Sequence, residues 1–421
     1  MDQPTGPLNK YLVPALTALS ENTYMSAIRA GMVSIVPLTI IGGLFMIVSE
    51  LPIPGWESHI EPFSHLLQVP VKATFGLLSI FVCFAIAHDL GQRLQQEAIV
   101  SASIATLIFL MLQINLEDLR LSMEGLGSNG IFTAILIALV CVRTQKLFTD
   151  ANLVIKLPES VPRVVYESFL SLSPLVFLVV SFWLIRFVVG LDINTMVQAT
   201  FSPLVFALNT LPGILMYALL VTMLWSVGIN GDNAMDAIVA PIFLQYLGAN
   251  VAAVSQGEPL PYITATGFFT TFVNVGGTGA TIALAFVLWN SKEPGFRKVS
   301  RLSLPTQVFQ INEPIFFGIP IVLNPIFMIP YILNALILTA GTYLLMYWNV
   351  INRPFVNVPW TTPPIIGHYL VSGGDWRAAI WGAVSILIAI LVYYPFAKTA
   401  ERQRLKAEAA GEAGDVPRAE P

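Results

Sequence analysis

Glu313 is the first candidate for chemistry in this sequence, because it is the only charged residue in the apolar stretch 302–352. A charge at the centre of a bilayer costs about 2.5–3.5 kcal/mol on insertion scales, so it normally faces a cavity or a partner. The amides of Gln310 and Asn312 lie beside it, and Pro314 removes a backbone donor. The pattern predicts a polar pocket at a helix break, which suits a small polar solute. The alternative is a solvated loop tip at the cytoplasmic edge.

A second polar cluster lies in WSVGINGDNAMD, which begins at Trp225 and contains Asn230. Asp232 and Asp236 are four positions apart and share one face if the segment is helical. An aromatic ring beside amides and a carboxylate suits a sugar, whose hydroxyls need acceptors. Asp232 is also the one candidate for a catalytic group. The alternative is an ordinary cytoplasmic turn, with Trp225 in the interfacial aromatic belt.

Two further motifs have weaker signals. NVGGTGAT, residues 274–281, lacks the Gly-Lys-Ser/Thr of a phosphate-binding loop and lies inside an apolar run. It predicts local unwinding or close helix packing. In SGGDWRAAIWG, Asp375 is placed to cap the following helix, whereas Trp376 could close over a ligand. Because the four histidines and two cysteines form no cluster with metal-ligand spacing, we expect no metal and no cofactor.

The composition indicates the elements that must position these residues. Of 421 residues, 55% are hydrophobic and 11% are charged, whereas a soluble domain carries about 25% charge. We therefore predict an all-α polytopic membrane protein, and we expect no nucleic-acid partner because no basic face stands out. About ten transmembrane helices are predicted from ten apolar runs: 27–48, 73–90, 98–113, 131–149, 169–190, 212–229, 234–252, 263–289, 324–348 and 378–396.

Loop charges favour ten crossings with both termini in the cytoplasm. With the N-terminus inside, most Lys and Arg residues fall in inner segments, and Arg120, Arg353 and Arg377 fall outside; this is a strong positive-inside bias. Residues 302–323 start and end on the inner side and are broken by prolines, which predicts a re-entrant hairpin. Residues 191–211 alternate polar and apolar residues at helical spacing and predict an interfacial helix.

These elements predict two membrane subdomains and a tail. Residues 1–200 form the N-terminal membrane subdomain, and residues 201–397 form the second, which contains the hairpin. Residues 398–421 are charged and rich in Ala, Gly and Pro, so we predict a cytoplasmic tail that begins with a short helix end and is then disordered.

Several longer stretches match one family together. They are MSAIRAGMVSIVPLTIIGGLFMI, ELPIPGW, ATFGLLSIFVCFAIAHDL, NVGGTGAT, GGDWRAAI and, the most specific, NEPIFFGIPIVLNPIFMIPYI. Over nearly its whole length the chain resembles enzyme IIC, the membrane permease component of the bacterial phosphoenolpyruvate-dependent sugar phosphotransferase system. Its closest match is the lactose/cellobiose/diacetylchitobiose family.

The resemblance implies a homodimer in the bacterial inner membrane, with ten transmembrane helices and two re-entrant hairpins. It implies that the first five helices form the dimer interface and that the later ones form a sugar-binding domain, which moves as a unit through the lipid. The 6-hydroxyl of a disaccharide would then be phosphorylated in the cytoplasm by a phosphocysteine of enzyme IIB. Since no IIB or IIA domain is recognisable here, we expect both to be separate proteins, and the chain alone is not clearly an enzyme.

The resemblance also assigns residues. It implies that Glu313, with its neighbour Asn312, holds sugar hydroxyls, and that Trp376 lies near the sugar. The family usually has Gly-Ile-His-Gly where this chain has Gly-Ile-Asn-Gly, so Asn230 replaces a histidine. A histidine titrates near pH 7, whereas an amide only forms hydrogen bonds. We hypothesise an altered substrate preference, with Asp232 as the nearest alternative base.

Two other functions remain open from the residues alone. An ion-coupled secondary transporter could use Glu313 as its proton or cation site, because broken helices and a lone carboxylate suit that mechanism too. A membrane sensor or scaffold that does not transport is the third possibility. The energy source for uptake distinguishes the phosphotransferase-system permease from the ion-coupled transporter. Absence of sugar binding would favour the sensor or scaffold.

Overall fold

The protein is described by a computed structural model over residues 21–49, 55–116, 118–155, 158 and 169–409. Helices dominate these ranges, and the only β-pairing within them is an isolated bridge between Ile114 and Leu121. The prediction of an all-α membrane protein is confirmed. Residues 1–20 and 410–421, which include both predicted cytoplasmic termini, lie outside the described residues.

The first group of helices packs around α6. Helix α6 contacts α2, α7 and α8, and α3 contacts α5. Helix α10 closes the group against α7 and α8. The members are α2 (Thr23–Ser34), α3 (Val36–Ser49), α4 (Trp56–Ile60), η2 (Glu61–Phe63), α5 (Ser64–Thr74), η3 (Phe75–Leu77), α6 (Leu78–Arg93), α7 (Ala98–Leu112), η4 (Glu124–Leu126), η5 (Ser128–Gly130), α8 (Ile131–Asp150), α10 (Leu172–Trp183) and η6 (Leu184–Val188).

The second group packs around α17 and α19. Helix α17 contacts α12 and α19, while α14 contacts α15 and α19. The members are α12 (Leu211–Ser226), η7 (Phe268–Val273), η8 (Thr278–Ala280), α14 (Thr281–Leu288), α15 (Pro294–Val308), α16 (Glu313–Gly318), α17 (Pro325–Tyr347), α18 (Pro364–Val371) and α19 (Trp376–Ala409).

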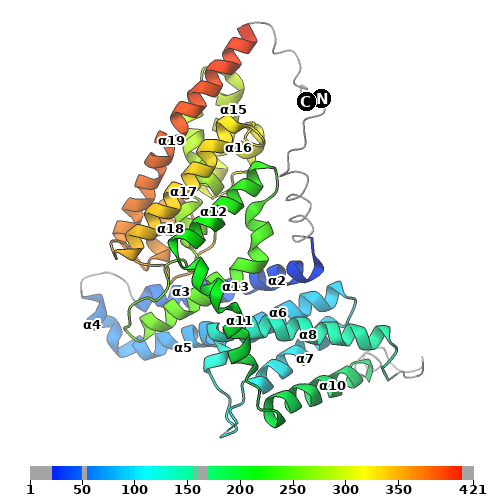
Figure 1. Ribbon diagram of the computed structural model, residues 1–421. Coiled ribbons are helices and arrows are strands. Elements are labelled where there is room, and N and C mark those ends of the chain that lie inside the picture. Colours follow the sequence, from blue (N-terminus) through cyan, green and yellow to red (C-terminus); the bar gives the residue numbers. More distant parts are fainter. Residues whose placement is uncertain (1–20, 50–54, 117, 156–157, 159–168, 410–421) are drawn as a thin grey trace.

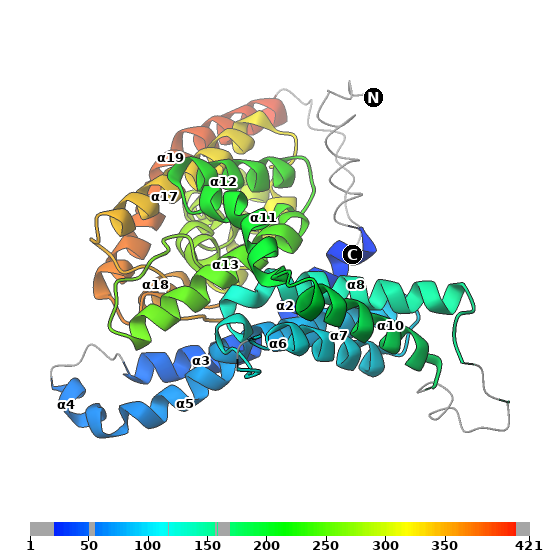
Figure 2. The ribbon, with the colours of Figure 1, turned by 60° about the horizontal axis from the view of Figure 1, so that its bottom comes forward.

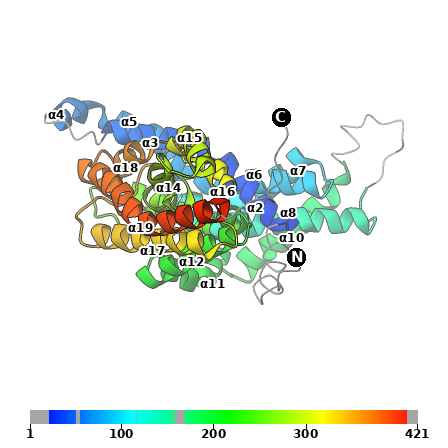
Figure 3. The ribbon, with the colours of Figure 1, turned by 90° about the horizontal axis from the view of Figure 1, so that it is seen from above.

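The two groups cross each other rather than running parallel. In Figure 1 the helices of the first group lie across the lower part of the molecule, and those of the second group stand above them. Helix α11 (Ile193–Leu208) contacts α8 and α12, and α13 (Gly231–Ser255) contacts α2 and α12. Figure 2 shows both at the junction, and Figure 3 shows α17 and α19 side by side from above. Two connecting helices therefore join the groups.

Among the described residues, seven helices are long and apolar enough to cross a membrane, or eight if the bent pair α10–η6 and α11 forms one span. The weakest predicted span, 234–252, falls on one of the seven, Gly231–Ser255. The predicted spans 98–113 and 212–229 fall on the shorter apolar helices α7 and α12. All ten predicted runs thus correspond to apolar helices, while the count of ten crossings stays a prediction.

Three details refine the predicted boundaries. The pair ending in α11 bends by 86°, so the segment predicted to be interfacial leaves the direction of α10. Helices α15 and α16 form a helical hairpin whose first helix begins at Pro294, before the predicted 302. Helix α19 continues to Ala409, so the predicted short helix end of the tail extends to that residue. Its C-terminal end is held because buried Glu401 accepts a hydrogen bond from Ser291 Oγ at 2.8 Å.

Candidate functional site

A tight turn joins α12 to α13 and brings their ends together. Gly228 has a φ of +88°, in the left-handed region that favours glycine. Asn230 then caps α13, because its Oδ1 accepts a hydrogen bond from the backbone N–H of Asn233 at 2.9 Å. Short polar side chains are preferred at this position because they satisfy a free helical N–H. Asn230, which the resemblance places where the family usually has a histidine, therefore caps a helix in this turn.

Asp232, in the first turn of α13, accepts three hydrogen bonds. Trp225 Nε1 and Thr278 Oγ1 both donate to Oδ2, at 2.8 and 2.7 Å, and Asn274 Nδ2 donates to Oδ1 at 3.3 Å. An ionised carboxylate has about four acceptor sites, so it can accept one more hydrogen bond. The donors come from α12 and from the segment between η7 and α14. They fix the orientation of a carboxylate that is only partly buried.

The segment 274–280 breaks the span Phe268–Leu288. Gly277 has a φ of +104°, and a Cβ placed on it would lie 2.4 Å from Cβ of Asn312. Only glycine therefore fits both the backbone conformation and the contact. The sequence prediction of local unwinding in this motif is confirmed.

The tip of the α15–α16 hairpin packs on this unwound segment through two amides. Gln310 Oε1 accepts hydrogen bonds from the backbone N–H groups of Gly276 and Gly277, at 2.6 and 3.1 Å. Asn312 Nδ2 donates to the carbonyl oxygen of Thr278 at 3.1 Å. The break exposes backbone groups that the hairpin then satisfies, as buried backbone polar groups require. The two predicted polar clusters, around Trp225 and around Gln310, therefore meet at one place.

Two polar atoms in this place have no hydrogen-bond partner among the described residues. They are Oδ1 of Asn274 and Nε2 of Gln310, on side chains that are 8% and 7% exposed. Leaving a buried polar group unpaired costs about 1–3 kcal/mol. One acceptor and one donor are thus available beside the Asp232 carboxylate, a combination that suits a neutral molecule with hydroxyl groups.

Glu313 lies at the edge of this cluster. It begins α16 and follows Asn312 directly, and its side chain is exposed. No ion pair or hydrogen bond joins its side chain to the part of the chain that the structure describes. Phe316, one turn further, packs edge-on against Trp225 with 5.0 Å between ring centroids. Because Trp225 is only 4% exposed, its ring holds Asp232 in place and offers no open face to a ligand in this conformation.

Trp376 does not lie with the other predicted residues. It opens α19 and is 65% exposed. The site contact on the same helix is Tyr393, whose hydroxyl donates to the carbonyl oxygen of Gly279 at 2.7 Å. At 1.5 Å per residue, Trp376 and Tyr393 are about 25 Å apart along the helix. The role of Trp376 near the sugar stays a prediction, because in this conformation Trp376 lies far from the other predicted residues.

Asp375 fulfils its predicted capping role. Its Oδ1 accepts a hydrogen bond from the backbone N–H of Arg377 at 2.9 Å, and its Oδ2 accepts one from that of Asn352 at 2.9 Å. Burial raises the pKa of Asp375, but the hydrogen bonds from the Arg377 side chain and from these N–H groups outweigh it and hold the pKa below its ordinary value.

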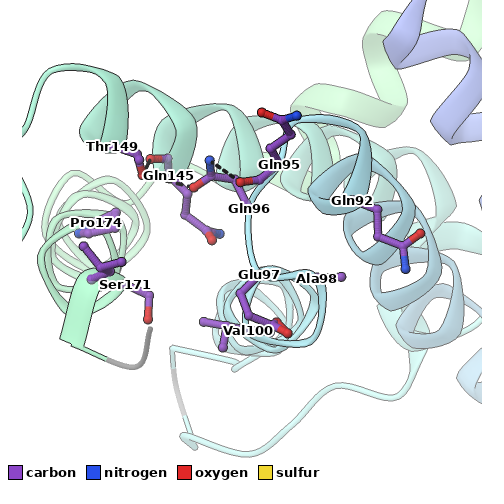
Figure 4. A pocket seen from close by; sticks show the side chains of 11 residues that line it. Gln92, Gln95, Gln96, Glu97, Ala98, Val100, Gln145, Thr149, Ser171 and Pro174 are labelled. Atoms are coloured by element: carbon purple, nitrogen blue, oxygen red, sulfur yellow. Dashed lines mark hydrogen bonds between the residues drawn. The ribbon is translucent and has the colours of Figure 1, made fainter. Parts of the chain in front are cut away.

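A separate polar cavity of about 720 Å³ lies in the first group. Figure 4 shows side chains from α6, α7, α8 and α10 around it. Gln96 Oε1 accepts a hydrogen bond from Thr149 Oγ1 at 3.0 Å. Gln145 is 4% exposed and its Nε2 has no partner among the described residues. None of the predicted site residues lines this cavity. The cavity and the predicted site are therefore different places in the molecule.

Sequence reasoning missed Asn274 and Thr278 as site residues. Their motif was interpreted through its glycines alone. The available signal was that polar side chains flank those glycines inside an apolar run, which is the composition of an unwound segment that lines a cavity.

Comparison with known proteins decides the family. A family model described as the phosphotransferase system EIIC matches residues 29–335. The chain belongs to this family. This EIIC chain is 32% identical to the lichenan permease IIC component of Bacillus subtilis, over 95% of its own length and 94% of that protein. It is also 32% identical to the cellobiose-specific EIIC component of Geobacillus stearothermophilus, with 97% of each chain covered.

A solved structure agrees with this assignment. The crystal structure of ChbC, the IIC component from the N,N'-diacetylchitobiose-specific phosphotransferase system, matches with a TM-score of 0.90 at 32% identity. The match covers 96% of this chain and 100% of that one. This EIIC is therefore a multi-pass membrane protein and a sugar permease component of the cellobiose, lactose and chitobiose type. Membership also implies a sugar substrate and EIIB and EIIA partners.

Proposed function

We propose that this EIIC binds a disaccharide at the site formed by Asp232, the segment 274–280 and the tip of the α15–α16 hairpin. It then carries the sugar across the bacterial inner membrane and presents the 6-hydroxyl to phosphorylated EIIB in the cytoplasm. The observation that supports this most strongly is the pair of buried, unpartnered polar atoms on Asn274 and Gln310 beside the Asp232 carboxylate.

The chemistry of the site favours a neutral sugar. Asp232 and Asn274 offer acceptors, and Gln310 offers a donor. Glu313 adds a second carboxylate at the edge of the same site, where it can bind hydroxyls through charge-assisted hydrogen bonds. Among the described residues, no Lys or Arg side chain takes part in the hydrogen bonds of this site, so it lacks the features that would favour an anionic substrate.

The arrangement of the groups supports an elevator-type movement. Every member of the hydrogen-bonded site comes from the second group or from the first turn of α13, so the second group can move with the sugar and keep the site intact. The first group would stay fixed and form the interface of a homodimer. We further propose that both termini are cytoplasmic and that EIIB and EIIA act as separate proteins.

The test uses the purified full chain in lipid nanodiscs and in vesicles. Titration calorimetry with cellobiose, lactose and N,N'-diacetylchitobiose should show saturable binding of at least one sugar. In vesicles, sugar phosphate should accumulate only with phosphoenolpyruvate and the soluble partner proteins. Uptake of free sugar driven by an ion gradient, without those proteins, would refute the proposal in favour of an ion-coupled transporter. Absence of binding to every sugar would favour a sensor or scaffold.

A further inference from the structure

Six exposed cations gather on α15 and the end of α19. Three lie on each helix: Arg297, Lys298 and Arg301 on α15, and Arg402, Arg404 and Lys406 on α19. We call these six residues the basic face. In Figure 1 the end of α19 and α15 lie together at the upper end of the second group. A hydrogen bond from Ser291, just before α15, to Glu401 of α19 holds the two helices together.

Two carboxylates beside the basic face, on Glu401 and Glu293, are turned inward. Glu401 and Glu293 are 4% and 3% exposed. Glu401 bonds Ser291 and pairs with Lys398 at 2.6 Å, and Glu293 accepts from the backbone N–H of Gly295 at 2.9 Å. Of the six cations, Arg404 alone approaches a carboxylate within the described part of the chain, Glu293 at 3.9 Å. The six cations are therefore exposed, while Glu293 and Glu401 are buried beside them.

The positive-inside bias explains why cations lie on this side but not how they pair. Two cations of the first group that are also predicted to be cytoplasmic have partners one helical turn away, whereas the exposed Arg143 forms no ion pair with the described residues. Lys146 pairs with Asp150 at 2.6 Å, and Arg93 pairs with Asp89. A topological signal needs only the presence of cations. Unpaired cations held on a rigid surface, in contrast, favour recognition of an anionic partner.

The basic face lies on the helix that leads to the candidate site. From Arg301 to the end of α15 at Val308 the helix rises about 10 Å. The chain then turns and places Gln310 and Asn312 on the segment 274–280. A protein held on the basic face would stand next to the hairpin tip and Glu313. A lipid headgroup bound to the basic face would have no role in phosphorylating a sugar at the hairpin tip.

We propose that the basic face is the docking surface for phosphorylated EIIB, which carries an anionic phosphoryl group. This inference rests on the proposed function. Arginine and lysine recognise phosphate and carboxylate groups through charge-assisted hydrogen bonds. Charges at the rim of an interface mainly speed association and are screened by salt. Docking through this face therefore affects the dependence of the rate on EIIB concentration and leaves sugar binding unchanged.

The test compares matched neutralised variants in nanodiscs. The first is R297Q/K298Q/R301Q, the second is R402Q/R404Q/K406Q on α19, and the control is R93Q/R143Q/K146Q in the first group. The probe is the phosphorylated EIIB, from the cellobiose, lichenan or diacetylchitobiose system, that gives the fastest sugar phosphorylation with the wild type. The KM for EIIB should rise about tenfold in either face variant and lose its salt dependence. The control and all sugar affinities should stay at the wild-type values.

Two outcomes would overturn the inference while leaving the proposed function intact. One is an unchanged KM for EIIB in both face variants, with wild-type phosphorylation intact. The other is a KM effect that appears in phosphatidylglycerol nanodiscs and disappears in pure phosphatidylcholine, which would assign the face to anionic lipid. If no EIIB supports phosphorylation by the wild type, the proposed function itself fails.

Discussion

The site around Asp232 and the cavity around Gln145 are both polar and enclosed by helices, yet they are built differently. The cavity is lined by side chains of regular helices and one short turn, and one of them, Gln145, has an unpartnered buried amide nitrogen. The Asp232 site has an unwound backbone, a carboxylate with three donors, and two unpartnered buried polar atoms from different elements. The broken backbone and the oriented carboxylate therefore distinguish the Asp232 site from the cavity, and they are the basis of our proposal that the sugar binds there.

The largest expected effect comes from adding a side chain to Gly277, where the backbone lies close to Asn312 in the Asp232 site. In Gly277→Ala, the new Cβ meets Asn312 and the residue keeps a φ of +104°. Overpacking costs roughly 1–3 kcal/mol. With a ψ of 167° the residue also lies in a backbone region that only glycine adopts readily, which costs another residue about 1–3 kcal/mol. Because the hairpin tip must move off the unwound segment, we expect sugar affinity to fall about 100-fold, measured by titration calorimetry.

Gly257→Ala is the matched control. Gly257 has a φ of +70°, but nothing lies within 4 Å of the position that a Cβ would take there. This variant should lose about 1 kcal/mol of stability from backbone strain and keep its sugar affinity. Equal loss of affinity in both variants would show that strain alone, without the contact to Asn312, explains the effect.

The next effect concerns the exposed carboxylate at the edge of the site. Glu313→Gln should keep the fold and lose about 10- to 100-fold in sugar affinity, because hydrogen bonds to a charged group contribute roughly 1.5–3 kcal/mol. Glu258→Gln, at an exposed turn after α13, is the control and should bind sugar as the wild type does. Wild-type affinity in Glu313→Gln would remove this residue from the site.

A pair of identical substitutions compares the two polar regions directly. Gln310→Met removes the acceptor for two backbone N–H groups and the unpartnered donor, so sugar affinity should fall about tenfold. Gln145→Met removes the acceptor for Ser101 Oγ in the cavity and should leave sugar affinity unchanged. Calorimetry that shows the reverse order would place the sugar in the cavity of the first group.

The smallest effect concerns Asn230. Asn230→Ala should lower the free energy of unfolding by about 1 kcal/mol through loss of the cap on α13, whereas Asn230→Ser should keep it. Thermal unfolding in detergent measures both. Asn230→His tests substrate preference, and we expect the order of affinities across the disaccharide panel to change. An unchanged order would leave the capping of α13 as the explanation for asparagine at this position.

The helices could be predicted from the sequence more fully than the contacts that bring distant side chains together. Apolar runs are long and their breaks contain glycine or proline, so spans and the unwound motif could be predicted locally. The contact between Asp232 and Thr278 depends on how α13 packs against a distant segment, and no local pattern encodes it. For the same reason the burial of Trp225 and the separation of Trp376 from the site became clear only in the fold.

Disaccharide binding to Asp232→Asn in nanodiscs, compared with Gln145→Met and the wild type, decides whether the sugar occupies this site. The substitution keeps the size of the side chain but removes the charge that orients three donors. We predict that Asp232→Asn weakens the Kd about 10- to 100-fold, since hydrogen bonds to a charged group contribute roughly 1.5–3 kcal/mol, while Gln145→Met binds as the wild type does. Wild-type affinity in Asp232→Asn, in a protein that unfolds at the wild-type temperature, would contradict the assignment of the sugar to this site.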